Sequence, residues 1–451
     1  MPSELIDLTG QEDEASAPVA TDQKKQAVSG WPSSQRTTTL DFVHHVDSEL
    51  HIQPKLYFTQ DGTWLLAACQ ISSTQIQVTA WNKTEVGHSS HSMRMDLSKV
   101  LKTKSQAANP QFTIHQVDFL CHASSKQLFL QVSFHSAPSL VLIPIDIHLE
   151  GENLLGDAFE VGPCDKEQKR ADLGFLTKDG IFVTLVRGAQ DHVPDKLIAY
   201  DLKSNKCVGS YEIPRQQQAE ARSSTQLIRS GDHLLVFVKE LGSKRPVRSL
   251  YLWSGDLPLS SHNMFSVSLP PDNFLSFCRD NPSGVIAASQ VSRGHQGNNH
   301  NVPVAGMVLL QLEVASCSCK ISGRTSSTNL SPLWGASPQD LYWSPTGSHL
   351  LALHNTWDHL ALDRLVSVPV MHSTDKSSWE FQQQSNDDDR SSIAKLVAAA
   401  SKAIRAQQTK TGDVIVAPDA NTLAYLVVES SEDPDGNIAE LESFQIHLIS
   451  K

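Results

Sequence analysis

The sequence predicts an all-β fold, a seven-bladed β-propeller that is closed by an N-terminal strand. Three observations predict it: a turn-then-strand phrase recurs seven times, apolar strands flank most of these turns, and one more alternating strand precedes the first repeat. The 451 residues are 39% hydrophobic and 19% charged, which is ordinary for a globular chain that buries a large core. Regularly repeated short strands are typical of propellers.

The recurring phrase places a turn residue before an apolar run, as in QDGTWLLAAC at 60–69 and PTGSHLLALH at 345–354. Tight turns need Gly, Asn, Asp or Ser for their backbone angles, and the runs that follow alternate or stay apolar as strands do. Successive turns are separated by roughly fifty to seventy residues, enough for one four-stranded blade. The predicted turn residues are Gly62, Ser125, Gly180, Gly231, Gly284, Gly347 and Ala420.

Short apolar strands lie on both sides of these turns. Strands before the turn are KLYFT (55–59), QVDFLC (116–121), NFLSFC (273–278) and DLYWS (340–344). Strands after the turn-and-strand phrase are QIQVTAWN (75–82), SLVLIPID (139–146), KLIAYD (196–201), RSLYLWS (248–254), MVLLQL (307–312) and RLVSVPV (364–370). Each repeat therefore supplies at least three antiparallel strands, with room for a fourth. Two stacked sandwiches are the alternative arrangement of these strands.

The two ends of the chain predict how the ring closes. The last repeat ends in ESFQIHLIS (442–450), which gives its blade three strands, and TTTLDFVHHV (37–46) is an unassigned alternating strand before the first repeat. If 37–46 pairs as the outer strand of the last blade, no sheet edge is left open between the terminal blades. The predicted propeller therefore covers residues 37–451.

One helical segment interrupts the strands at about 391–407. Apolar residues recur there on one helical face, and Asp387 to Asp389 precede it, where acids complement the helix dipole. The segment either packs on the flank of the propeller or docks a partner. The face that would do either consists of Ile393, Leu396, Val397, Ala400 and Ile404.

Several strands resemble those of WD-repeat proteins. The segments AWN (80–82), AYD (199–201) and LWS (252–254) resemble divergent versions of the WD dipeptide. The segment YWSPTGSHLLAL (342–353) is similar to the SPxGxxL hairpin of these repeats. The Gly-His pair usual in such repeats is reduced to GH at 87–88. The resemblance implies a divergent WD-repeat-like propeller and concerns architecture rather than one family.

Composition restricts the setting of the protein. The net charge of −12 gives no general attraction to nucleic acid or to anionic membrane, although Lys244, Arg245 and Arg248 form one basic loop. No run approaches the ~18 apolar residues of a membrane span, and the N-terminus lacks the pattern of a secretory signal. The seven scattered cysteines are typical of reduced intracellular thiols. We expect neither a membrane segment nor direct nucleic-acid binding.

Motifs of catalysis and metal binding are incomplete. The chain has no phosphate-binding glycine loop, no G-x-S-x-G and no H-E-x-x-H. His88 and His91 have half the spacing of a metal site, and Cys317 with Cys319 is one isolated pair. SEDPDGNIAELE (431–442) partly matches a calcium loop, yet apolar strands flank it, so a hairpin between two strands of the last blade is expected. We expect no cofactor, no metal and no catalytic residues.

The tail at 1–36 is predicted to be disordered, because its polar composition cannot bury enough surface to fold alone. LIDLTGQEDE (5–14) is its exception, with strand-like apolar spacing and acids on one side. This segment resembles a SUMO-interaction motif, which adds a strand to the sheet edge of its partner while its acids meet a basic rim. A different strand-accepting partner and chance similarity remain open. The motif residues are Leu5, Ile6, Asp7, Leu8, Thr9, Glu12, Asp13 and Glu14.

Together these patterns predict a non-enzymatic protein-interaction scaffold. The tail would bind SUMO or a SUMO-modified partner, and the propeller would bind other proteins, so that two weak sites reinforce each other. SUMO binding would imply a nuclear rather than a cytoplasmic setting. The alternatives are a structural subunit of a larger complex and a propeller enzyme acting on a small substrate in the central channel.

Overall fold

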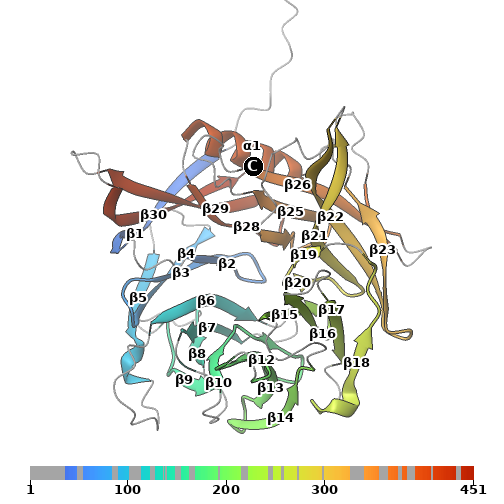
Figure 1. Cartoon of the computed structure of the whole chain (residues 1–451). Helices are drawn as coiled ribbons and strands as arrows, with labels where there is room; N and C mark the ends of the chain where they lie inside the picture. The colour runs from blue at the N-terminus through green and yellow to red at the C-terminus, as the bar shows by residue number, and fades with distance from the viewer. Residues whose placement is uncertain are drawn as a thin grey trace, which may run out of the picture. The chain divides into compact units, whose positions relative to one another are not determined.

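The structure is a computed structural model, and it places the strands of residues 36–450 in seven sheets arranged as a propeller (Figure 1). The seven-bladed fold predicted from the repeats is thereby confirmed. Residues 1–35 form a separate unit outside the described residues. The other residues outside the description are 48–53, 84–89, 101–112, 122–126, 136, 138–139, 148–153, 162–167, 191–192, 215–221, 242–246, 255–257, 272–273, 297–298, 326–339, 355–363, 374–377, 383–391, 408–409, 433–437 and 451.

The blades follow one another along the chain. Blade 1 contains β2 (Lys55–Phe58), β3 (Trp64–Gln70), β4 (Gln75–Asn82) and β5 (Ser90–Asp96). Blade 2 contains β6 (Ile114–Cys121), β7 (Leu128–Phe134), β8 (Leu140–Ile145) and β9 (Phe159–Val161). Blade 3 contains β10 (Gln168–Ala171), β11 (Phe175–Leu176), β12 (Ile181–Gly188), β13 (Lys196–Asp201) and β14 (Lys206–Glu212). In blades 1 and 2, antiparallel pairing joins consecutive strands, and in blade 3 both β10 and β11 pair antiparallel with β12.

The middle blades are connected by a parallel pairing. Blade 4 contains β15 (Arg222–Ser230), β16 (His233–Leu241), β17 (Val247–Ser254) and β18 (Met264–Val267). Blade 5 contains β19 (Phe274–Phe277), β21 (Val285–Gln296), β22 (Asn299–Glu313) and β23 (Ser318–Arg324). Between β19 and β21, the short β20 (Asp280–Asn281) pairs in parallel with β15 of blade 4. The segment β20, which follows the first strand of blade 5, therefore lies directly beside the first strand of blade 4.

The last two blades complete the ring. Blade 6 contains β24 (Asp340–Trp343), β25 (His349–His354), β26 (Arg364–Ser373) and β27 (Ser378–Phe381). Blade 7 contains β28 (Lys410–Val416), β29 (Thr422–Glu432), β30 (Ile438–Ser450) and β1 (Arg36–Asp47). The helix α1 (Ser392–Gln407) lies between β27 and β28 in sequence, and two single 3-10 turns occur at Leu97–Lys99 and Ser261–Asn263.

The glycines at the predicted turns have the left-handed backbone that glycine tolerates. Six of the seven predicted turn residues have positive φ angles, namely Gly62 (70°), Gly180 (81°), Gly231 (60°), Gly284 (78°), Gly347 (68°) and Ala420 (56°). Glycine adopts this left-handed conformation at little cost. For Ala420 the conformation is unfavourable by about 1 kcal/mol or more, because its Cβ approaches the following carbonyl oxygen. The seventh predicted turn residue, Ser125, lies outside the described residues.

Strand β1 closes the ring as the sequence predicts. It pairs antiparallel with β30 in a register that sets Thr37 opposite Ile449 and Leu40 opposite Ile446. Leu40 and Phe42 are buried in one core cluster with residues of blade 1, and the Phe42 ring lies 5.7 Å from that of Trp81. The N-terminal strand thus completes blade 7 and covers its interface with blade 1.

The core is divided among the junctions of neighbouring blades. Successive side chains of a strand point to opposite faces of its sheet, so each blade packs against both of its neighbours. In β3, for example, Leu65 packs toward blade 7 and Leu66 packs toward blade 2. Each hydrophobic cluster of the described residues draws from two successive blades, and the seven clusters cover the seven junctions. Two stacked sandwiches would give two cores, so this alternative is wrong.

Helix α1 packs on the propeller. The predicted apolar face is buried, with exposed fractions of 2% for Ile393, 0% for Leu396, 3% for Val397, and 0% for Ala400 and Ile404. These side chains join a cluster with Leu353 of blade 6 and Tyr425 of blade 7. The docking face proposed from the sequence is therefore already covered by the chain itself, and a partner would reach it only if the helix left the sheet.

Two smaller predictions concern loops and membranes. The segment 433–437 joins β29 to β30, whose ends pair through Glu432 and Ile438, so the stretch that resembles a calcium loop is part of a hairpin. Asp433, Asp435 and Gly436 themselves lie outside the described residues. Within the described part of the chain, no helix is long and apolar enough to cross a membrane.

Candidate functional site

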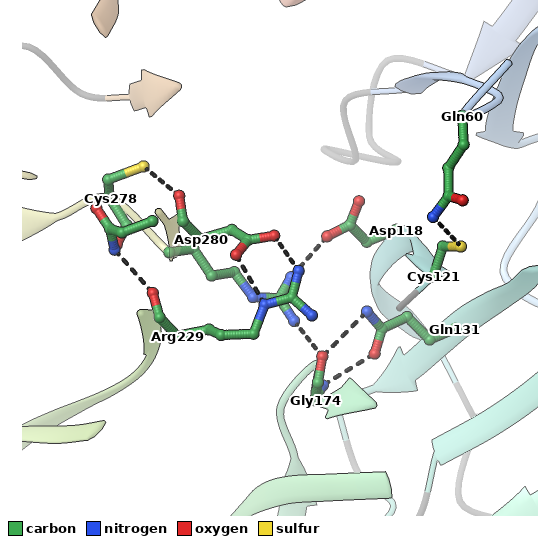
Figure 2. A network of polar contacts seen from close by, with 10 residues as sticks. Gln60, Asp118, Cys121, Gln131, Gly174, Arg229, Cys278 and Asp280 are labelled. Atoms are coloured by element: carbon green, nitrogen blue, oxygen red, sulfur yellow. Dashed lines mark hydrogen bonds and ion pairs between the residues drawn. The ribbon is translucent and has the colours of Figure 1, made fainter. Parts of the chain in front are cut away.

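Charged residues from several blades meet at the centre of the ring, where β6, β15 and β20 approach one another (Figures 1 and 2). We call this group the central cluster. Its members are Asp118, Gly174, Phe175, Arg229, Arg279 and Asp280. Asp118 lies on β6, Arg229 on β15 and Asp280 on β20, while Gly174 directly precedes β11, which begins at Phe175, and Arg279 directly precedes β20.

Arg279 connects blades that are not neighbours. It lies between β19 and β20 of blade 5, and its Nη1 donates to Oδ2 of Asp118 on β6 of blade 2 at 2.6 Å. Its Nη2 donates to the carbonyl of Gly174 in blade 3 at 2.8 Å. Its guanidinium carbon lies 4.8 Å from the centroid of the Phe175 ring. One side chain therefore links blade 5 to blades 2 and 3.

Arg229 forms a second ion pair beside the first. From β15 its Nε donates to Oδ1 of Asp280 at 2.7 Å, and its Nη2 contacts Oδ2 of the same carboxylate. Its guanidinium carbon lies 5.2 Å from the Phe175 centroid, so the same ring faces both arginines. Burial alone would lower the pKa of Arg229, but Asp280, together with Cys121 and Asp232, outweighs burial and raises that pKa. Fork-like pairing of this kind fixes the plane of the guanidinium.

Gly174 sits where a side chain has no room. A Cβ at this position would lie 2.3 Å from the carbonyl oxygen of Val183 and 2.5 Å from the Phe182 ring. The Gln131 amide holds the peptide from the other side, because Oε1 accepts from Gly174 N at 2.9 Å and Nε2 donates to its carbonyl at 3.4 Å. The carbonyl that receives Arg279 is thus fixed by close packing and by two hydrogen bonds.

Asp118 experiences opposing electrostatic effects. Burial raises the pKa of its carboxyl, Arg279 and Lys55 lower it, and Asp413 raises it, with a net rise. Its Oδ1 also accepts from Phe119 N at 2.9 Å. Lys55 and Asp413 form a separate pair, with 3.6 Å between Nζ and Oδ1. Desolvation therefore outweighs the attraction of the two cations for the charged form.

A phenol and a thiol lie beside the cluster and are held neutral. Tyr57 stacks on Phe119 with 5.4 Å between the ring centroids, and Gln60 Nε2 donates to Cys121 Sγ at 3.4 Å. Burial raises the pKa of Tyr57, and burial also raises the pKa of Cys121 although Tyr57 and Arg229 oppose it. Because the thiolate is the nucleophilic form, this environment does not activate Cys121.

A second polar group joins blades 3 and 4. Arg187 on β12 contacts Asp172 at 2.6 Å and Asp195 at 3.0 Å, and it donates to the carbonyl of Thr225 on β15. The Thr225 hydroxyl in turn donates to Asp195 Oδ2 at 2.8 Å. These contacts neutralise the arginine and fasten the two blades together.

A histidine pair lies near this arginine. The rings of His115 and His135 have centroids 4.3 Å apart. Burial, Arg170 and His135 lower the pKa of His115 to about 4, and burial with Arg170 lowers that of His135. Both imidazoles are therefore neutral at neutral pH.

The described site residues that the sequence predicted do not belong to the central cluster. The motif residues of the tail fall outside the described residues, as do His88, Lys244 and Arg245. His91 is exposed on β5, Cys319 is buried on β23, and the described residues include no group of three or more His, Cys, Asp or Glu that could hold a metal.

Sequence reasoning missed the central cluster. The sequence feature that could have indicated the cluster is a charged residue in, or directly after, a short apolar first strand. Asp118 lies within QVDFLC, and Arg279 directly follows NFLSFC. That signal marks the individual strands but not their pairing, because Asp118 and Arg279 are 161 residues apart along the chain.

Comparison with known proteins adds only structural likenesses. No protein-family model matches the chain, and no curated protein matches it. A prolyl endopeptidase structure is 11% identical, covers 88% of this chain and 50% of that chain, and has a TM-score of 0.44. Sqt1 of Chaetomium thermophilum, solved with the N-terminus of ribosomal protein L10, is 12% identical, with 88% and 83% coverage and a TM-score of 0.41. A luciferin-regenerating enzyme is 8% identical, with 92% and 96% coverage and a TM-score of 0.38. At these values the likenesses carry no argument about a substrate or a partner.

Proposed function

We propose that the chain is a non-enzymatic protein-interaction scaffold. Its WD-repeat-like propeller binds other proteins, and its tail binds SUMO or a SUMO-modified partner by strand addition. The observation that supports the scaffold is the pairing of charges in the central cluster. Arg279 with Asp118, and Arg229 with Asp280, neutralise each other and join blades 2, 3, 4 and 5. Side chains used in this way stabilise a fixed platform for partner binding.

The position of the tail motif supports the second part of the proposal. The ring-closing strand begins at Arg36, whereas the motif ends at Glu14, so the ring is complete without it. A segment that the fold does not need is free to pair with the sheet edge of another protein, where main-chain hydrogen bonds give affinity and apolar side chains give specificity. SUMO binding would place the protein in the nucleus.

The test is a titration of labelled SUMO into the full chain and into the Ile6→Ala/Leu8→Ala variant. Removing both apolar side chains should weaken binding at least about tenfold, since each buried aliphatic side chain contributes about 1.5–3 kcal/mol. The matched control is Val19→Ala/Val28→Ala, which shortens two aliphatic residues of the same tail outside the motif. Equal affinity in the motif variant and the full chain would refute SUMO binding by this segment.

A further inference from the structure

The guanidinium of Arg279 is held at the centre of the ring as a bound ligand would be. Blade 2 supplies a carboxylate from Asp118, and blade 3 supplies the Gly174 carbonyl and the Phe175 ring, while the arginine comes from blade 5. The contacts measure 2.6 Å to the carboxylate, 2.8 Å to the carbonyl and 4.8 Å to the ring centroid.

This set of groups selects a guanidinium over other cations. The carboxylate and the carbonyl accept from two different nitrogens of one planar fork, and an ammonium offers no such geometry. A phenyl face attracts a weakly hydrated planar cation, which favours arginine again. Arg229 repeats the pattern on the same ring with Asp280 as its carboxylate. Both cations that Phe175 attracts among the described residues are arginines.

We propose that Asp118, Gly174 and Phe175 form an arginine-binding site, which Arg279 fills from within and which an arginine side chain of a basic partner peptide occupies in its place. The inference deepens the proposed scaffold function and rests on the propeller's binding a protein partner. The surrounding blades enclose Asp118 enough to raise the pKa of its carboxyl, yet the Asp118 and Arg279 side chains are 29% and 30% exposed, so the site is reachable. A chain with a net charge of −12 also attracts basic segments.

An internal occupant lowers the affinity for an external one. A partner arginine must displace Arg279, so the apparent affinity is the intrinsic affinity multiplied by the fraction of time that the site is vacant. Removing the internal guanidinium should therefore expose a competent site. The Gly174 carbonyl stays in place without Arg279, because Gln131 and the packing against Val183 hold it.

The experiment measures binding of the peptide acetyl-Gly-Arg-Gly-amide to the full-length Arg279→Met variant by isothermal titration calorimetry. Methionine keeps an apolar stem beside the ring but removes the charge. We expect the variant to bind this peptide at least about tenfold more tightly than the same peptide with citrulline, which has the shape of arginine without its charge. The unchanged protein should bind the arginine peptide more weakly than the variant does.

Two control variants make the result specific. Arg94→Met removes an exposed arginine of β5 that donates to Gln77, and it should bind as weakly as the unchanged protein. Adding Asp118→Asn to Arg279→Met should abolish the preference for arginine over citrulline. If Arg279→Met does not fold, Arg279→Gln keeps two N–H donors and takes its place in the same comparison.

The outcomes separate this inference from the proposed function. No arginine binding in the folded variants, or equal binding of arginine and citrulline, would overturn the arginine site while leaving the SUMO titration to decide the tail. Ile6→Ala/Leu8→Ala should bind the arginine peptide as the unchanged protein does. A loss of arginine binding in that variant would contradict a site built only from the propeller.

Discussion

Among individual residues, Asp118 determines how the central cluster responds to pH. Its pKa is raised by burial and by Asp413, against Arg279 and Lys55. A carboxyl whose pKa is higher in the folded than in the unfolded state gives its full contribution to stability below the unfolded pKa. That contribution is lost as pH rises through the folded pKa. The charged form of Asp118 therefore lowers the free energy of unfolding relative to the protonated form.

Asp118→Asn should show this dependence, because asparagine imitates the protonated carboxyl at every pH. We expect the free energy of unfolding of the variant, relative to the unchanged protein, to increase as pH rises from about 4 to 7.5. Urea unfolding across this range measures it. Glu313→Gln is a control, since Glu313 ends β22 away from the central cluster and its pKa is lowered by Lys320 and Ser316. If the difference in free energy of unfolding between Asp118→Asn and the unchanged protein does not change with pH, the ion pair with Arg279 fully offsets the effect of burial on the pKa of Asp118, and the prediction is wrong.

Residue types explain why part of the site escaped prediction. Glycine at a turn is a local signal, and the positive φ of Gly62 and Gly347 follows from it directly. Gly174 has no such signal, since what requires glycine there is the approach of Val183 and Phe182 from the next strand. The contact of Arg279 with Asp118 depends on how seven blades are placed around an axis, and no local pattern determines that.

At the scale of strands and helices, the buried elements were predictable and the outer strands were not. Strands that are paired on both sides within their blade, such as β3 and β7, are almost wholly buried, so their apolar runs are recognisable in the sequence. The fourth strand of blade 1, β5, reads SHSMRMD and is mostly exposed. A strand that faces solvent needs no apolar side chains, so it leaves only a gap between the better-marked strands. Helix α1 was predictable because its buried face has helical spacing.

The closing strand gives a prediction for the element β1. Deleting residues 37–46 should lower the midpoint of thermal unfolding by about 10 °C or more. The deletion removes the buried Leu40 and Phe42, each contributing about 2–5 kcal/mol, and opens the junction of blades 7 and 1. Differential scanning calorimetry measures the midpoint. Only a small shift would mean that the ring is closed without β1.

At the scale of the whole molecule, the tail motif precedes the propeller in sequence. The propeller runs from Arg36 onward and is complete in itself, whereas the motif of the tail lies well before it. At the centre of the ring, the paired charges of the central cluster connect blades that are distant in sequence. We infer two recognition elements on one chain, and their linkage would raise affinity through effective concentration.

The most direct measurement is made on the chain lacking residues 1–30, with SUMO affinity and thermal midpoint determined on the same sample. We predict an unchanged midpoint together with the loss of SUMO binding, because the ring-closing strand remains and the motif is gone. Retained SUMO binding would contradict the role of the tail. A sharply lower midpoint would contradict the separation of the tail from the fold.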